Sequence, residues 1–164
     1  MPKKLSMTGL KVELENWHRE RFEGIDSSFM PYFSKGGWEG WLQVEWAMYL
    51  NSQDYDVLRE EPIYNNNQRA DLVINKNIPR GDNQVFNNIA IEIKCQSIYN
   101  SQDQFLESVK SDINKLEELR YYWSKLMVVV AIDDNILNLL RRENFLIRMH
   151  TNLAFGYRSV KHRL

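Results

Sequence analysis

The sequence predicts an α/β fold in which a mixed central β-sheet is flanked by helices. Three short segments rich in Val, Ile and Leu follow one another before the middle of the chain. A long amphipathic segment then separates them from a nearly unbroken β-branched run at 126–132. Because a helix that crosses between two strands of one sheet makes them parallel, we expect at least one parallel pair.

The N-terminal part contains two predicted helices. Residues 8–24 are rich in Glu and Arg with spaced apolar positions, which indicates an additional helix packed on the main domain. Pro31, Gly36 and Gly37 interrupt the pattern within 27–37. A second helix follows over 38–50, and its buried face is expected to contain Trp38, Trp41, Leu42, Trp46 and Tyr49.

The remaining elements follow in order. Strands are expected at 55–59, 69–74 and 89–95, with a hairpin-like loop at 75–88. Residues 102–123 are the next predicted helix, which leads into the buried strand at 126–132. Asp133 or Asp134 can cap a short helix over 135–140, and 145–150 is the last predicted strand. This order fits one domain over residues 1–164, with a core at about 38–132.

Composition excludes several classes of protein. With 164 residues, 43% hydrophobic and 26% charged, the chain is typical of one soluble globular domain. No apolar run approaches a membrane span, and no apolar stretch follows the lysines near the N-terminus as it would in a secretion signal. Cys95 is the single cysteine, so an internal disulfide and a Cys-based zinc cluster are excluded. We therefore expect a cytoplasmic protein.

Two predicted strands each place one acid inside an apolar frame. Asp71 opens one of them, and Glu92 lies in the middle of the next. Lys94 follows at the next position on the same face, because side chains alternate along a strand. A buried ionised acid is costly unless a cation or hydrogen-bond donors compensate it. If these strands pair, Asp71 and Glu92 lie near each other with Lys94 beside them.

This grouping suits a hard divalent ion, Mg²⁺ or Mn²⁺, which prefers oxygen ligands and keeps several waters. We expect Asp71, Glu92 and the backbone carbonyl of Ile93 as its ligands. Such an ion polarises a phosphoryl oxygen and lowers the pKa of a bound water, while Lys94 orients that water or neutralises charge on the phosphate. The alternative is a plain Glu92–Lys94 ion pair on an exposed strand face, worth about 0–1 kcal/mol, with Asp71 as a turn residue.

These residues resemble the signature of the PD-(D/E)XK nuclease superfamily, which is an Asp followed by Glu-X-Lys on consecutive core strands. The resemblance covers roughly 38–132, and Ala70 replaces the Pro of the nominal signature. It implies a restriction-endonuclease-like αβββαβ core, with an extra N-terminal helix at 8–24. It also implies a metal-dependent endonuclease whose catalytic residues include Asp71, Glu92 and Lys94.

Many members of that superfamily add an acid from the first core helix, and Glu39 and Glu45 compete for that role. Glu39 and Gln43 lie one turn apart and resemble the Glu-x-x-x-Gln pattern of the VRR-NUC branch, so Glu39 is preferred as the catalytic acid. Glu45 lies on the face of Trp38 and can also point inward. The alternative for either acid is a solvated helix position.

The neighbours of Lys94 receive separate predictions. Gln96 shares the face of Lys94 and is either an accessory contact to a metal-bound water or phosphate, or a surface residue. Cys95 points the opposite way and is expected in the core. The three histidines are far apart in the sequence and have no metal-ligand spacing.

The segment 141–164 carries a local excess of positive charge, although the formal net charge of the chain is −1. Against the single acid Glu143, it contains Arg141, Arg142, Arg148, Arg158, Lys161 and Arg163. We expect either a surface that holds a nucleic-acid backbone or a solvated segment.

The leading hypothesis is a metal-dependent endonuclease that acts on DNA. One alternative keeps the chemistry and changes the substrate to RNA, for example a tRNA. Another is a non-catalytic partner-binding, inhibitory or immunity-type protein on the same fold. Because the chain leaves little room for a separate recognition domain, targeting is expected from a homodimer or a companion chain, with 8–24 and 141–164 as the additions available for it.

Overall fold

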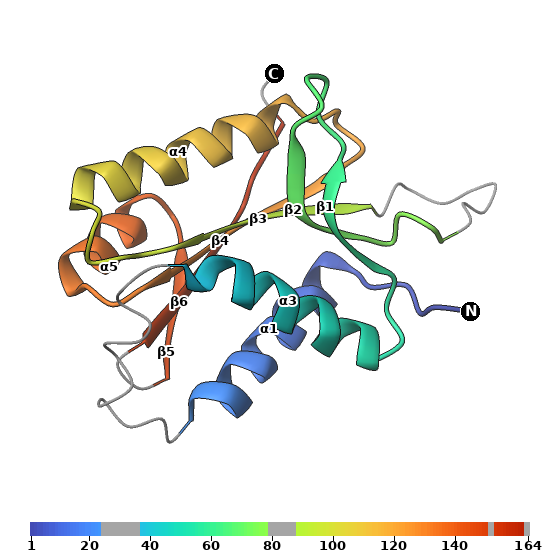
Figure 1. Cartoon of the computed structure of the whole chain (residues 1–164), viewed down its shortest axis with the longest axis horizontal. Helices are drawn as coiled ribbons and strands as arrows, with labels where there is room; N and C mark the ends of the chain where they lie inside the picture. The colour runs from blue at the N-terminus through green and yellow to red at the C-terminus, as the bar shows by residue number, and fades with distance from the viewer. Residues whose placement is uncertain (24–36, 79–87, 151–152, 163–164) are drawn as a thin grey trace.

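The computed structural model describes residues 1–23, 37–78, 88–150 and 153–162, and its centre is a six-stranded mixed sheet (Figure 1). The strand order is β1-β2-β3-β4-β6-β5, in which β3 and β4 are parallel and all other neighbours are antiparallel. The predicted α/β class and the predicted parallel pair are therefore confirmed.

The elements run in the order α1, α3, β1, β2, β3, α4, β4, α5, β5, β6. The helices are α1 (Met7–Phe22), α3 (Trp38–Ser52), α4 (Gln102–Glu118) and α5 (Asp134–Arg142). The strands are β1 (Val57–Pro62), β2 (Arg69–Ile74), β3 (Ile89–Cys95), β4 (Ser124–Ala131), β5 (Leu146–His150) and β6 (Leu153–Ser159). None of these described helices has the length and apolar character needed to cross a bilayer.

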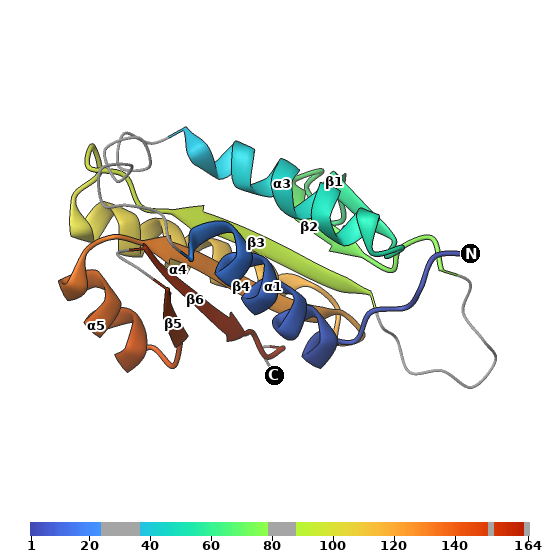
Figure 2. The same cartoon turned by 90° about the horizontal axis from the view of Figure 1, so that it is seen from below.

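The sheet separates two hydrophobic cores. Helices α1 and α3 lie side by side on one face, and α4 and α5 cover the other (Figures 1 and 2). Because side chains alternate along a strand, β3 contributes to both cores: Ile91 and Ile93 join the α1/α3 core, whereas Ala90 joins the α4/α5 core. Glu92 and Lys94 therefore lie on the α4 face of an otherwise apolar strand.

Local signals explain where the helices begin and end. Gly37 precedes α3 with a φ of 77°, a left-handed conformation that costs glycine little. Ser101 and Gln104 form a capping box at the start of α4, and Asp133 caps α5, as predicted for Asp133 or Asp134. At the other end of α4 the buried Lys125 donates to the carbonyls of Glu117 and Leu119, which stabilises the end of the helix.

The predicted N-terminal helix is present and packs on the main domain. Its Glu13 accepts hydrogen bonds from the phenols of Tyr49 (3.0 Å) and Tyr55 (3.1 Å). Its Glu15 contacts Arg148 at 3.2 Å and accepts from the Tyr157 hydroxyl. These contacts join α1 to α3, to the segment before β1 and to the two C-terminal strands.

The order of elements over 38–132 is confirmed, but several details differ. The helix predicted over 102–123 ends at Glu118, and the predicted strand at 55–59 begins later, at Val57. The buried face of α3 follows a spacing of four residues, with Trp38, Leu42, Trp46 and Leu50 in the core. Trp41 was expected in that face and is instead 42% exposed, with its ring centroid 6.4 Å from that of Trp17 in α1. Part of the loop at 75–88 and most of the break at 27–37 lie outside the described residues.

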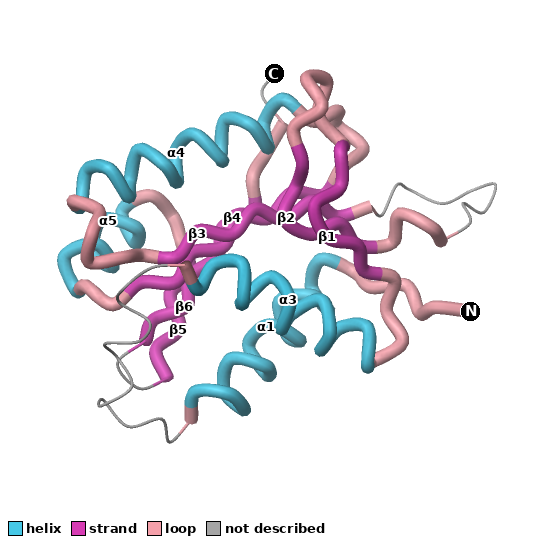
Figure 3. Tube along the Cα trace, in the orientation of Figure 1, coloured by secondary structure: helices cyan, strands magenta, loops and turns pink. Residues whose placement is uncertain are grey.

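The C-terminal segment differs most from its prediction. A sixth strand, β6, was not expected, and it inserts between β4 and β5 (Figure 3). Gly156 interrupts its apolar pattern, and the packing explains the glycine: a Cβ there would lie 2.6 Å from the Cδ1 of Ile147 and 2.9 Å from the Cγ2 of Val129. The segment from Arg141 is therefore largely part of the sheet and its connections.

Candidate functional site

The site lies where β2 diverges from β3. The last observed pair of this ladder is Leu72 opposite Ile91, and the next residues along the two strands are Asp71 and Glu92. Beyond that pair the Asp71 side chain takes the place of a backbone acceptor: its Oδ2 accepts the backbone N–H of Ile93 at 2.6 Å. A charged acceptor makes this a stronger hydrogen bond than a ladder bond. The two predicted strand acids are therefore brought together at a fork in the sheet.

Helix α3 supplies a second carboxylate along the same edge of β3. Glu39 Oε2 accepts the backbone N–H of Cys95 at 3.0 Å, one alternation further along the strand from Ile93. Gln43, one turn later and only 5% exposed, donates from Nε2 to Asp71 Oδ1 at 2.9 Å. Arg59 of β1 in turn donates to Gln43 Oε1 at 3.2 Å. The predicted pairing of Glu39 with Gln43 on one helix face thus brings both to the site.

Glu92 is the most enclosed of the acids, with 1% of its surface exposed. Its Oε1 accepts the Tyr64 hydroxyl at 2.5 Å and lies 2.8 Å from Lys115 Nζ. Tyr64 follows β1, and Lys115 projects from α4. Within the described part of the chain, Glu92 Oε2 has no hydrogen-bond partner.

Lys94 extends between the two helices that border the fork. Its Nζ lies 3.1 Å from Asp112 Oδ2 on α4 and 3.5 Å from Glu39 Oε1 on α3. The Asp112 contact is close in distance but lacks the angle of a hydrogen bond, so that buried oxygen keeps unused acceptor capacity. Glu92 pairs with Lys115 and not with Lys94. The alternative of a simple Glu92–Lys94 ion pair on an exposed face is therefore wrong.

Burial controls the electrostatics of the two strand acids. Loss of solvent raises the pKa of Asp71 from 3.8 to about 6, with Glu39 and Asp112 adding to the increase and the Ile93 N–H opposing it. Burial, followed by the nearby charge of Asp71, raises the pKa of Glu92 from 4.5 to about 8, although Lys115 and Tyr64 oppose this. Burial alone lowers the pKa of Lys94, but Glu39 and Asp112 outweigh it, so the pKa is raised and the ammonium stays charged.

The donor set fits a divalent cation. Four carboxyl groups and two lysines meet here, an excess of negative charge that a doubly charged ion would compensate: Glu39, Asp71, Glu92, Asp112, Lys94 and Lys115. Ile93 N–H faces Asp71, and because both polar groups of a strand residue lie on one edge, its carbonyl faces the same way. In the described residues no three His, Cys, Asp or Glu side chains form a ready metal cage. Mg²⁺ commonly uses one or two carboxylates and completes its shell with water and substrate phosphates.

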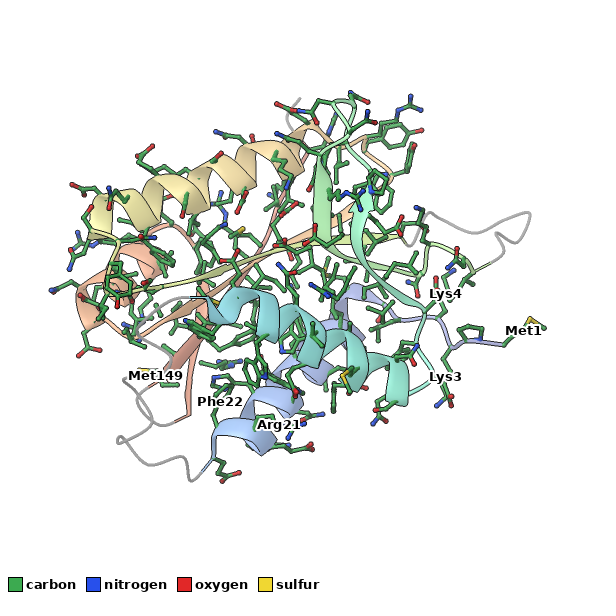
Figure 4. The ribbon with its side chains drawn as sticks, in the orientation of Figure 1. Met1, Lys3, Lys4, Arg21, Phe22 and Met149 are labelled. Carbon is green, nitrogen blue, oxygen red and sulfur yellow. The ribbon has the colours of Figure 1, made fainter. Side chains whose placement is uncertain are left out.

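The other predicted positions have different surroundings. Glu45 pairs with Arg21 of α1 at 3.0 Å, away from the fork, and Arg21 lies near the C-terminal end of that helix (Figure 4). Gln96 was considered a surface residue or a metal contact; it is 6% exposed, and its Oε1 accepts the backbone N–H groups of Ile132 and Asp133. Gln96 thus closes the end of β4. Cys95 is buried in the core, as predicted.

Sequence reasoning missed four residues that complete the site, namely Arg59, Tyr64, Asp112 and Lys115. None lies within the strand pattern that singled out Asp71, Glu92 and Lys94. One signal was available for two of them. Asp112 and Lys115 lie one turn apart on a helix that was predicted to cross over the sheet, so both could be expected on its sheet-facing side.

The basic segment does not gather on one face. Arg148 pairs with Glu15 of α1, whereas Arg158 lies 3.7 Å from Glu143 at the end of α5, on the opposite side of the sheet. Arg141 is held by Asn138 and Met149 on the outside of α5. Arg142 lines a cleft with Arg158, Lys161 is exposed, and Arg163 lies outside the described residues. Arg148 and Arg158 thus cannot contact the same stretch of a nucleic-acid backbone.

Two clefts give access to the site. One of about 690 Å³ lies between the β1–β2 turn and α4 and reaches Asp112 and Lys115. Another of about 530 Å³ is bordered by Glu39, Lys94 and the exposed Tyr99. Family models, curated proteins and solved structures provide no match to the chain. Its function must therefore be inferred from this site.

Proposed function

We propose that the chain is a divalent-metal-dependent endonuclease of the PD-(D/E)XK type that hydrolyses phosphodiester bonds in DNA. The observation that carries the proposal is that Asp71 binds the backbone N–H of Ile93, directly between Glu92 and Lys94, which share one face of β3. The succession α3, β1, β2, β3, α4, β4 supports it, since it has the order of the restriction-endonuclease-like core.

The residues have distinct roles in this proposal. Asp71, Glu92 and the Ile93 carbonyl would hold Mg²⁺ or Mn²⁺, which when bound polarises a phosphoryl oxygen and acidifies a water molecule. Lys94 places its ammonium at the phosphate, where it neutralises the charge that develops during hydrolysis. Glu39 holds Lys94 from the α3 side, and Gln43 orients Asp71. The two flanking clefts leave room for substrate on either side of these groups.

The direct test is plasmid cleavage with Mg²⁺ and with Mn²⁺. Asp71→Ala and Lys94→Ala should each lower the rate by at least about 100-fold, because the first removes a metal ligand and the second removes the positive charge placed at the phosphate. Lys110→Ala, which changes an exposed lysine of α4, should cleave like the wild type. Equal cleavage by all preparations would show a contaminating nuclease and refute the assignment. Parallel digestion of total RNA and tRNA separates DNA from RNA as the substrate.

One observation favours a second candidate, a non-catalytic partner-binding protein on this fold. Each charged group of the site already has a partner within the chain: Lys115 pairs with Glu92, and Lys94 pairs with Glu39 and Asp112. Such a network can persist for stability alone. Calorimetry separates the two candidates, since the endonuclease must bind Mg²⁺ or Mn²⁺ and the non-catalytic protein need not.

A further inference from the structure

Two donors from different elements converge on a single oxygen of Glu92. Tyr64 comes from the turn after β1, and Lys115 comes from the last turn of α4. Both contact Oε1, at 2.5 Å and 2.8 Å. Tyr64 and Glu92 are almost completely enclosed, with exposed fractions of 7% and 1%. Tyr64 and Lys115 therefore hold Glu92 inside the domain.

Lys115 is itself held in place. Its ammonium donates to the backbone carbonyl of Arg69 at 2.9 Å. It also lies 4.7 Å from the centre of the Tyr64 ring, which is within the range of a cation–π contact. With Glu92 these make three contacts around one ammonium group. A lysine fixed by a backbone carbonyl, an aromatic ring and a carboxylate cannot swing freely, so it fixes Glu92 in turn.

The consequence is an asymmetric carboxylate. Oε1 is occupied by Tyr64 and Lys115, whereas Oε2 has no partner among the described residues. Rotation of the carboxylate would break both contacts at once in a buried place, which is costly. We propose that Tyr64 and Lys115 are positioning residues, which hold Glu92 so that its second oxygen is presented to the divalent ion. This inference rests on the proposed function and deepens it.

The expected effect follows from how outer groups act on metal ligands. Residues that hydrogen-bond a ligating carboxylate typically change metal affinity by about 10- to 100-fold when removed, because the ligand must then be ordered during binding. Tyr64→Phe removes one hydroxyl and no charge, so it isolates this effect. Lys115→Met keeps the length of the side chain and removes the ammonium, which also removes a positive charge that repels the ion.

The experiment measures Mn²⁺ binding to the full chain by calorimetry, and the Mn²⁺ concentration that gives half-maximal plasmid cleavage. We expect Tyr64→Phe and Lys115→Met each to raise the Mn²⁺ dissociation constant and the half-maximal Mn²⁺ concentration by about 10-fold or more. The maximal cleavage rate should largely recover at excess Mn²⁺. Tyr121→Phe and Lys110→Met are matched controls, since both side chains are well exposed. A merely structural role would reduce the amount of active protein and leave the half-saturating concentration unchanged.

The outcomes separate this inference from the proposed function. Unchanged Mn²⁺ affinity in Tyr64→Phe, with binding lost in Asp71→Ala, overturns the positioning role and leaves the metal site intact. Tighter Mn²⁺ binding in Lys115→Met would show that Lys115 competes with the ion, which also contradicts its positioning role. A wild-type chain that binds no Mn²⁺ overturns the proposed function and this inference together.

Discussion

The two sides of the fork between β2 and β3 compensate a buried carboxylate in different ways. On the α3 side, the donors that Asp71 receives from the described residues are neutral, namely the backbone of Ile93 and the amide of Gln43. On the α4 side, Glu92 receives a phenol and the ammonium of Lys115. Direct pairing with a cation would be expected to lower a carboxylate pKa. Glu92 nevertheless has the higher pKa of the two, about 8 against about 6.

The difference shows that burial outweighs pairing at this site. Glu92 is 1% exposed and lies near the charge of Asp71, and both effects favour its protonated form. One lysine does not restore what the carboxylate loses by leaving water. Among the described groups of the fork, negative charge therefore exceeds the positive charge that compensates it.

The largest effect should come from metal binding at two pH values. Protons and Mg²⁺ compete for the same carboxylates, so binding should be much tighter at about pH 8.5 than at about pH 5.5. Mg²⁺ at about 100 times its dissociation constant adds about 2.7 kcal/mol to the free energy of unfolding. Thermal melts should then rise by roughly 5–10 °C at the higher pH and by under about 1 °C at the lower. An equal rise at both values, or any rise in Asp71→Ala, would contradict the comparison.

A second effect concerns the stability of the metal-free protein. The unfolded chain loses its Asp71 and Glu92 protons near 3.8 and 4.5, whereas the folded protein keeps them until about 6 and about 8. The folded state thus binds more protons in this window, and stability falls as the pH rises from about 4 to about 8. Glu92→Gln resembles the protonated acid, so it should match the wild type near pH 4 and melt roughly 10 °C higher near pH 9. A difference in melting temperature between Glu92→Gln and the wild type that stays constant across this pH range would rule out a raised Glu92 pKa.

The smallest effect on metal affinity should come from the α3 side of the fork, where the donors to Asp71 are neutral. Gln43→Ala removes the amide that holds Asp71 Oδ1, but the Ile93 N–H still holds Oδ2. We expect Mn²⁺ affinity to fall by about threefold to tenfold, at the lower end of effects from outer groups. Gln53→Ala, at the exposed end of the same helix, is the matched control. A loss of Mn²⁺ affinity larger than that caused by Tyr64→Phe would contradict the expectation that the α4 side contributes more to metal binding than the α3 side.

Much of the framework was predictable because it depends on local patterns. The apolar periods of α4 and β4 indicated a helix followed by a buried strand, and hence the parallel pairing of β3 with β4. The alternation of β3 put Glu92 and Lys94 on one face. The proximity of Asp71 to Glu92 followed once these strands were assumed to pair. The helix spacing also brought Glu39 and Gln43 to one side.

Other features were not predictable from these patterns. Strand β6 was missed because Gly156 breaks its apolar pattern, and the need for that glycine comes from Ile147 and Val129 in other strands. The basic residues of 141–164 looked like one group in the sequence. They are divided because β5 and β6 direct Arg148 and Arg158 to opposite faces of the sheet.

By itself the sequence determined the succession of elements and the strand faces that carry Asp71, Glu92 and Lys94, because hydrophobic periods act over neighbouring residues. Only the tertiary structure decided which groups meet those side chains. Tyr64 and Lys115 reach Glu92 from positions 28 and 23 residues away in sequence. Such contacts depend on how β1, β3 and α4 pack against one another, and no local pattern records that packing.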